Sequence, residues 1–514
     1  MGRTCDYSDT TASPTPEDFQ YLRQKVQELE ERLQNQSRHT SVPRSITMTD
    51  DAGGVAIGGN SIPSIYAPFL FLDSDAYEFG RFTIPKARMP ISPEILEALG
   101  DITEVQGIVE TYFLTAHTWM PIVSKKRLYQ QLMNPLAEQN ADFALLYLCM
   151  KLIIQHPPEP PATVQTPLYV IAKRLYFLVE TSGVYSIPLL QAGVLISLYE
   201  LGHAIYPAAY LSIGQCARLG HALGIHGKDV PQMLPKVGTW TELEERRRVW
   251  WAVVVLERFV NLGGKGHPLS TEDASRDTYL PANDSIWDSG VSVFSSGSTS
   301  SAHKLPQEMV TNEPLLISSS ASVQAGNFAR LAQASHLLGC VIRHTNDLPT
   351  DIPFRLEEAR QLDRTIRALY KLLPGKSADD SIGACTPLAV CFSAIMTLYD
   401  PYTCQTPGQT PDELSHTVEA VQGLKNISEE VARLSHDKLA AIEYGLDQTS
   451  PLILDCVYQA AASYAWMVRE TGEAEYVEKA RVLRRVFEVV GRRWRAAAEY
   501  LRILEATDRE LAGL

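Results

Sequence analysis

The sequence predicts an all-α fold, in which a multi-helical body follows one short coiled-coil helix. Two observations support the helical body: apolar residues recur at helical spacing along the middle of the chain, and strand-like alternation is sparse throughout. A third observation, a heptad pattern near the N-terminus, supports the coiled coil. With 514 residues, 45% of them hydrophobic, the chain is long enough for two or three packing units.

The first predicted element is a coiled-coil dimerisation helix over residues 16–36. Its apolar positions are spaced alternately by three and four residues, and they are Phe19, Leu22, Val26, Leu29 and Leu33. The charged pairs that would flank them in a parallel dimer are opposite in sign, which favours self-pairing. Because so short a coil is marginally stable alone, it would need support from the body or from a bound template. The alternative is a solitary amphipathic helix packed on its own domain.

Composition divides the rest of the chain. Residues 37–90 lose the helical period and gain Gly, Ser and Pro, so we expect a flexible linker. Residues 91–285 are predicted to form a helical domain and residues 326–514 a C-terminal helical region. The Ser-rich segment 286–325 between them has no period and is predicted to be disordered.

Two antiparallel helices are predicted at the centre of the helical domain. Their apolar stripes are Leu190, Val194, Leu198 and Leu201 in the first, and Ile213, Ala217, Gly220 and Leu223 in the second. Pro207 marks the turn between them. Gly214, Gly220 and Gly224 would each weaken the second helix by about 1 kcal/mol relative to Ala. We therefore expect this helix to lie close against a neighbour's backbone.

A central buried helix is predicted over residues 249–259, which are apolar on nearly every side. Three consecutive arginines, at 246–248, stand at its start, where the helix dipole disfavours cations. We therefore expect at least one of them to pair with a carboxylate, and Glu272 and Asp273 in the following loop are candidates.

The acidic composition limits the classes of partner. A net charge of -14 argues against nucleic-acid binding by the body, because non-specific affinity for nucleic acid comes from cationic side chains. The 8 cysteines are scattered singly, which favours reduced thiols. The longest apolar run, residues 249–256, is far shorter than the roughly 20 residues that span a bilayer. We expect a soluble intracellular protein with no membrane partner.

Motifs typical of enzymes are absent from the sequence: there is no H-E-x-x-H, no G-x-S-x-G and no G-x-x-x-x-G-K-[ST]. His221 and His226 would not share a helix face, so we expect a core polar residue and a helix-end cap rather than two ligands. Cys385 and Cys391 could suggest redox sensing, although single thiols in apolar helices usually fill the core.

Four segments, in this order, resemble motifs of the fungal Zn2Cys6 transcription factors and their all-helical middle homology region. They are "YFLTAHTWMPIVSKKRLYQQL" at 112–132, "AAYLSIGQCARLGHALGIH" at 208–226, "EERRRVWWAVVVLERFVNLGGKGHPLS" at 244–270 and "DTYLPANDSIW" at 277–287. Two positions depart from the family pattern: His267 stands where Arg is usual, and Glu257 where Asp is usual. The resemblance implies a structural core that includes Arg247, Arg248, Trp250, Trp251 and Glu257.

Residues 1–15 contain "TCDYSD", which resembles the final Cys-x-Tyr of the family's zinc cluster. Cys5 would then be a remnant, the last of six cysteines that hold two Zn²⁺ ions, with the other five missing from this chain. One thiol cannot complete a site, because Zn²⁺ takes four ligands. The alternative is a terminal cysteine with no such history. We expect no cofactor here; zinc, and promoter DNA as a partner, are expected only where a complete N-terminal cluster exists.

The resemblance implies a nuclear transcriptional regulator without enzymatic activity, of the pathway-specific type that controls secondary-metabolite gene clusters. It also implies a homodimer, or a heterodimer with a related regulator. The alternative is a helical scaffold, or a ligand-sensing partner of a cluster-bearing regulator, that does not itself bind DNA. An all-helical enzyme is disfavoured, and no effector is indicated.

Overall fold

The computed structural model describes most of the chain beyond residue 66. The described ranges are 67–79, 87–134, 140–159, 162–227, 230–264, 266–289, 315–320, 323–346, 351–375, 382–405 and 407–512. All of them belong to one compact unit, Ser61–Leu514. Cys5 and the predicted coiled coil at 16–36 lie outside the described residues.

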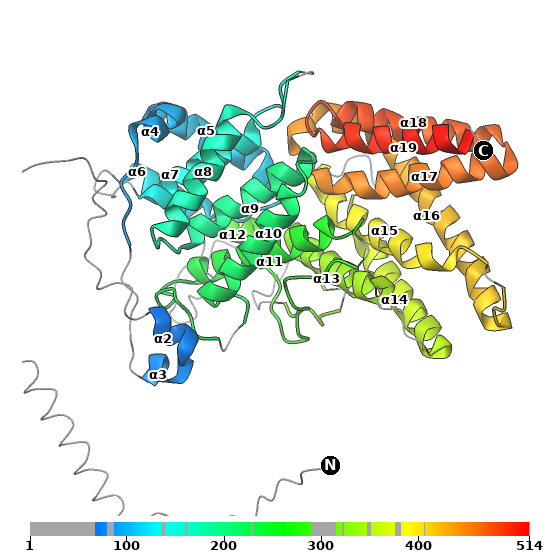
Figure 1. The fold of residues 1–514 in the computed structure, drawn as a ribbon, viewed down its shortest axis with the longest axis horizontal. Helices are drawn as coiled ribbons and strands as arrows, with labels where there is room; N and C mark the ends of the chain where they lie inside the picture. The colour runs from blue at the N-terminus through cyan, green and yellow to red at the C-terminus, as the bar shows by residue number, and fades with distance from the viewer. Residues whose placement is uncertain are drawn as a thin grey trace, which may run out of the picture. The chain divides into compact units, whose positions relative to one another are not determined.

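The regular secondary structure of the described residues is helical, apart from a single isolated bridge between Tyr279 and Leu316, which confirms the all-α prediction (Figure 1). The helices of the N-terminal half are α2 (Ala67–Leu72), α3 (Ser74–Phe79), α4 (Pro93–Leu99), α5 (Ile102–Leu114), α6 (Lys125–Met133), α7 (Ala141–Ile154), α8 (Pro167–Thr181), α9 (Ile187–Gly202), α10 (Ala208–Leu223), α11 (Trp240–Val260) and α12 (Asp284–Ser289). Helices α2 and α3 fall inside the range 37–90, where the sequence shows no helical period.

The C-terminal half is built from longer helices. They are α13 (Asn327–Asn346), α14 (Ile352–Leu372), α15 (Cys385–Tyr399), α16 (Pro411–Tyr444), α17 (Leu454–Thr471), α18 (Ala474–Val490) and α19 (Ala496–Ala512). Helix α13 packs against both α15 and α11, and α17, α18 and α19 pack on one another (Figure 1). One hydrophobic core therefore runs through both halves, from Ile95 to Leu504.

Helix α9 is the central helix of the N-terminal half. Residues 189–202 are all buried, and α7, α8, α10 and α11 pack around them. The helix begins where the Ser186 hydroxyl accepts a hydrogen bond from the Leu189 amide at 3.2 Å. Helix α10 follows after a short turn that contains Pro207 and packs back on α9, so the predicted helix pair is confirmed.

The three glycines of α10 differ in what they contact. A Cβ on Gly220 would lie 2.6 Å from the Trp250 ring, so this glycine makes room for a side chain, not for the expected backbone. Gly224 does meet backbone: it ends α10 in the left-handed conformation, with φ at 73°, close to the chain at Pro231. The nearest atom to a Cβ on Gly214 would be Ser270 Oγ at 3.6 Å, an ordinary contact, so no close approach requires that glycine.

One stretch, Ile382–Tyr402, is long and apolar enough to cross a membrane by length and composition. In the structure 83% of its apolar window is buried. Helix α15, which forms most of this stretch, is surrounded by α13, α14, α16 and α17. The stretch is therefore a core helix of the folded unit.

Candidate functional site: the polar core around helix α11

Helix α11 carries the Arg-Arg-x-Trp-Trp segment through the centre of the fold. It starts at Trp240, where the Thr239 hydroxyl accepts a hydrogen bond from the Glu242 amide at 3.2 Å. The sequence placed arginines 246–248 at the start of the helix. In the structure they lie beyond its first turn. Nearly every residue from 244 to 259 is buried, so polar groups here must find partners inside the protein.

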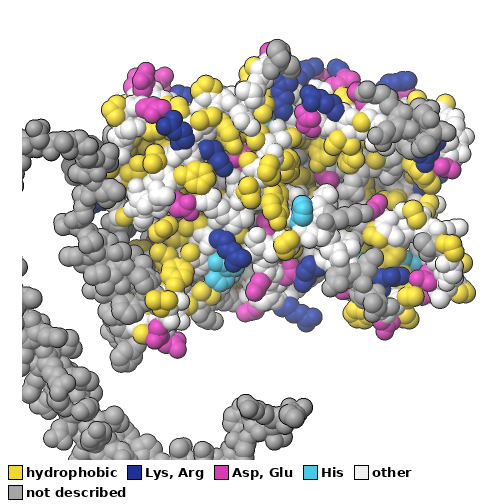
Figure 2. Space-filling view, in the orientation of Figure 1, with side chains coloured by type: hydrophobic (Ala, Val, Ile, Leu, Met, Phe, Trp, Pro, Cys, Tyr) yellow, Lys and Arg dark blue, Asp and Glu magenta, His cyan; other side chains and the backbone are white. Residues whose placement is uncertain are grey.

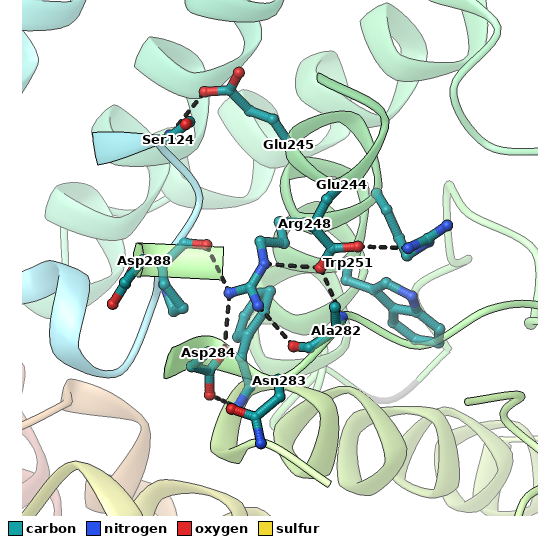
Figure 3. A network of polar contacts seen from close by, with 12 residues as sticks. Ser124, Glu244, Glu245, Arg248, Trp251, Ala282, Asn283, Asp284 and Asp288 are labelled. Carbon is teal, nitrogen blue, oxygen red and sulfur yellow. Dashed lines mark hydrogen bonds and ion pairs between the residues drawn. The ribbon is translucent and has the colours of Figure 1, made fainter. Parts of the chain in front are cut away.

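Arg248 is the centre of a buried network (Figure 3). Its side chain is fully buried, and its Nε donates to Glu244 Oε1 at 2.9 Å. Its Nη1 donates to Asp284 Oδ1 at 2.9 Å, and its Nη2 donates to the Ala282 carbonyl oxygen at 2.7 Å. The guanidinium also lies over the Trp287 ring, 4.2 Å from its centroid. The network attaches the chain at residues 282–287 to α11.

Asp284 extends this network to the C-terminal half. Its second carboxylate oxygen, Oδ2, accepts a hydrogen bond from the Phe328 amide at 3.1 Å, in the first turn of α13. A carboxylate there also offsets the positive end of the helix dipole. Arg248 and Asp284 together therefore join α11 to the beginning of α13.

A second buried network lies at the other end of α11. Glu257 accepts hydrogen bonds from the Ser270 amide, from the Thr271 amide at 3.2 Å and from the Thr271 hydroxyl at 2.5 Å. Arg258 pairs with Glu257 and, at 3.2 Å, with Asp273 Oδ1. This pair holds the loop after α11 against the helix.

The prediction that at least one of the arginines pairs with a carboxylate is confirmed, but the candidate partners named for them are wrong. Arg246 pairs with Glu242 at 2.9 Å, and Arg247 and Arg248 both pair with Glu244. The predicted loop partner, Asp273, pairs with Arg258 instead. The reason is geometric: glutamates three or four residues earlier on the same helix are adjacent to the arginines, and Asp273 lies at the other end of α11, beside Arg258.

Comparison with known protein families decides to which family the chain belongs. The model of the fungal specific transcription factor domain matches residues 109–366, which include α11 and both of its networks. The chain belongs to this family. It is a transcription regulator of the Zn2Cys6 type and not an enzyme, and its family implies a nuclear location.

Three curated relatives extend the comparison. Transcription factor BOA15 of Botryotinia fuckeliana is 40% identical over 179 residues, which are 35% of this chain and 98% of the relative. Transcription factor tazR of Aspergillus terreus is 29% identical over 43% of this chain and 34% of its own length. The pigment biosynthesis transcriptional activator pigB of Monascus ruber is 28% identical over 38% of each chain. The chain thus spans only about a third of the length of tazR and pigB.

In this fungal-specific transcription factor domain, the motif residues of α11 occupy the interior. Arg248, Trp251 and Glu257 are at most 1% exposed, and Trp250 is 9% exposed. Trp251 Nε1 donates to the Tyr279 carbonyl oxygen at 2.9 Å. Arg247 is only partly buried and lies over the Tyr279 ring. Arg248, Trp251 and Glu257 are so enclosed that they hold the fold together and present no surface on which to bind DNA or a substrate.

The domain brings His221 and His226 together, contrary to the expectation from their spacing. Their ring centroids are 4.4 Å apart, and both rings contact Trp250. Gly224 ends α10 and reverses the chain, so helix-face geometry does not apply to His226. Burial and the neighbouring His221 lower the pKa of His226.

The described residues do not fit a zinc cluster. None of their His, Cys, Asp and Glu side chains forms a group of three or more that could hold a metal ion. No disulfide joins any of the described cysteines, and Cys149, Cys216, Cys391 and Cys456 are buried. Cys385 is partly exposed. Cys5, the predicted remnant of a zinc cluster, lies outside the described part of the chain.

Sequence reasoning missed a third network, made by residues 491–495 ("GRRWR") between α18 and α19. Arg493 is 1% exposed and donates to the carbonyl oxygens of Ile153 and Gln155 at the C-terminal end of α7. Burial lowers the pKa of the Arg493 guanidinium to about 10. Trp494 Nε1 donates to the Thr449 carbonyl oxygen at 2.8 Å. The only signal in the sequence was the clustering of Arg and Trp between two amphipathic helices.

The face shown in Figure 2 mixes acidic, basic and hydrophobic side chains. The described residues on this face form no continuous basic band. This distribution agrees with the net charge of -14.

Proposed function

We propose that this chain is a pathway-specific regulator of a secondary-metabolite gene cluster. The observation that carries the proposal is its membership of the fungal specific transcription factor family together with its similarity to pigB, which is named a pigment biosynthesis transcriptional activator. The buried networks of α11 support a body whose role is structural and regulatory.

The mechanism proposed for DNA recognition places the reader N-terminal to the helical body. Residues 16–36 would pair two chains, and a zinc cluster ending at Cys5 would place a helix of each subunit in the major groove. The coil and the linker at 37–90 would set the distance between the half-sites. The acidic composition of the body supports a DNA reader outside the body, because contacts to DNA phosphates require cationic side chains.

The test is deletion and overexpression of the gene in its native host, followed by transcript measurement across the genome. The proposal expects expression of one contiguous set of biosynthetic genes to change in opposite directions in the two strains. A matched control strain carries the chain with Leu22→Asp and Leu29→Asp, which should behave as the deletion. Dispersed changes in primary-metabolism genes, or no change, would contradict the proposal.

A second candidate is a partner that acts only with a cluster-bearing relative. In this case the relative would supply the zinc cluster, and this chain would supply its helical body. Mobility-shift assays with the purified full chain discriminate the two candidates. A shift of promoter DNA by the chain alone supports the first, and a shift only after co-expression with a cluster-bearing relative supports the second.

A further inference from the structure

A cavity of about 680 Å³ lies beside the N-terminal part of α11. Its walls come from α6, α7, α9 and α11, together with residues 87–89 and the loops that precede α9 and α11. This volume falls within the roughly 300–1,000 Å³ of pockets that enclose small molecules. The cavity is separate from the Arg248 network, although α11 contributes to both.

The carboxylates of the cavity are already partnered. Glu245, the most buried of them, accepts hydrogen bonds from the Ser124 amide at 2.8 Å, from Gln191 Nε2 at 3.1 Å and from Arg127 Nη1. Asp142 accepts one from the Ser186 hydroxyl at 2.7 Å. A cationic ligand would therefore find no free counter-charge in this wall.

The acidic and basic side chains of the wall are also balanced. The acidic ones are Asp142, Glu242 and Glu245, and the basic ones are Arg88, Arg127 and Arg246. An ionised ligand would lose its hydration on entering, with no net charge of opposite sign to compensate that cost. The lining favours a neutral ligand.

Two buried polar atoms of the wall remain without a protein partner. Arg246, 4% exposed, uses its Nη atoms on Gln232, Pro235 and Glu242, and its Nε–H has no acceptor among the described residues. Gln191, 1% exposed, donates from Nε2 to Glu245 and to the Ile122 carbonyl oxygen at 2.7 Å, and no described residue donates to its Oε1. The cavity thus offers one donor and one acceptor, each of which is costly to leave unbonded.

The rest of the wall is mixed: apolar side chains such as Leu128, Leu146 and Ile187 lie beside the side-chain amides of Gln131 and Asn140. We propose that this cavity is an effector site for a neutral small molecule with both apolar and polar groups, which carries a carbonyl or ether oxygen for Arg246 and a hydroxyl for Gln191. The ligand would contact α11 directly through Glu245 and Arg246, next to the Glu244 that holds Arg248. Binding would thereby reach the helix that joins the two halves of the body. This inference goes beyond the proposed function and is independent of which genes are regulated.

The test uses the purified full chain and prodan, a neutral naphthyl ketone whose fluorescence shifts to the blue in a dry site. We expect saturable binding of one prodan per chain. Gln131→Trp, which fills the cavity from the partly exposed side of α6, should weaken binding at least tenfold. Lys126→Trp, on the same helix and outside the cavity, is the matched control and should bind prodan as the unmodified chain does.

Circular dichroism verifies that each variant is folded. Where Gln131→Trp fails to fold, Gln130→Trp, an exposed position in the same wall, replaces it. Absence of saturable prodan binding, or equal binding by the cavity-filling and control variants, would overturn the site. Tighter cavity-dependent binding of the anion 1-anilinonaphthalene-8-sulfonate than of prodan would overturn the neutral class of ligand.

Discussion

Arg248 Nη1 lies 2.9 Å from Asp284 Oδ1, and this one ion pair connects the central helix α11 to the residues that receive the N-terminus of α13. The two residues are 36 positions apart in the sequence, and Arg248 is fully buried. The stability of the body should depend on this pair more than on any exposed one.

Replacement of Arg248 by Met should lower the free energy of unfolding by about 3–5 kcal/mol, because Glu244 and Asp284 lose the charge that compensates their burial. Urea denaturation followed by circular dichroism measures this change. The control is Arg433→Met, which removes an exposed pair with Glu430 and should cost less than about 1 kcal/mol. Equal effects of the two variants would contradict a central role for Arg248.

Two glycines of the same helix should respond in opposite directions to Ala. Gly220→Ala places a methyl group 2.6 Å from the buried Trp250 ring and should destabilise the protein by about 1–3 kcal/mol. Gly214→Ala meets only an ordinary contact and should be neutral or stabilising by up to about 1 kcal/mol, since Ala is the better helix former. Thermal unfolding of both variants measures these changes in stability. A Gly220→Ala protein as stable as the unmodified one would show that the ring can move aside.

Stability should fall with acidity in part through His203. Burial and the nearby Arg493 and Arg495 lower the pKa of His203 to about 3, from 6.5 in a solvated side chain. Between these values the unfolded chain binds a proton that the folded chain excludes, so this contribution is complete above pH 6.5 and is lost as the pH falls toward 3. The slope approaches about 1.4 kcal/mol per pH unit below pH 6.5.

Urea unfolding of the unmodified chain and of His203→Gln, repeated at several pH values from 7.5 to 4.5, tests this. The variant should show a shallower dependence on pH. His436→Gln, at an exposed position, is the control and should leave the slope unchanged. Identical slopes for all three proteins would remove His203 from the explanation.

The predicted coiled coil can be tested by mass. Leu22→Asp with Leu29→Asp places charges at two positions of the apolar seam and should convert a dimer into a monomer in light scattering. The control is Gln20→Asp with Gln27→Asp, on the solvent side of the same heptads, which should remain dimeric. An unchanged mass for the seam variant would exclude the coil as the dimer contact.

Much of the fold could be predicted because the apolar spacing that marks a helix involves residues close together in the sequence. The stripe from Leu190 to Leu201 repeats within one helix, and in the structure α9 and α10 form the expected pair. The family resemblance depended on four segments between residues 112 and 287, taken in combination and in their order along the chain. Short helices such as α2 were missed because six residues are too few to show a period.

The partners of polar residues were predictable only where they lie on one helix. Arg247 and Glu244 are three residues apart, so their contact follows from helix geometry. Other contacts join parts of the chain that are far apart in sequence, and the local sequence does not indicate the partner. Examples are the contacts of Asp284, of Gly220 and of the segment 491–495.

The sequence by itself determined that the chain is helical, that its centre is the apolar helix with Trp250 and Trp251, and to which family it belongs, because periodicity and motif order are properties of neighbouring residues. Only the tertiary structure decided that Arg248 binds Asp284, that His221 meets His226 and that a cavity opens beside Glu245. These relationships depend on how helices pack across long separations in the chain, where burial requires each polar group to find whichever partner the packing brings near.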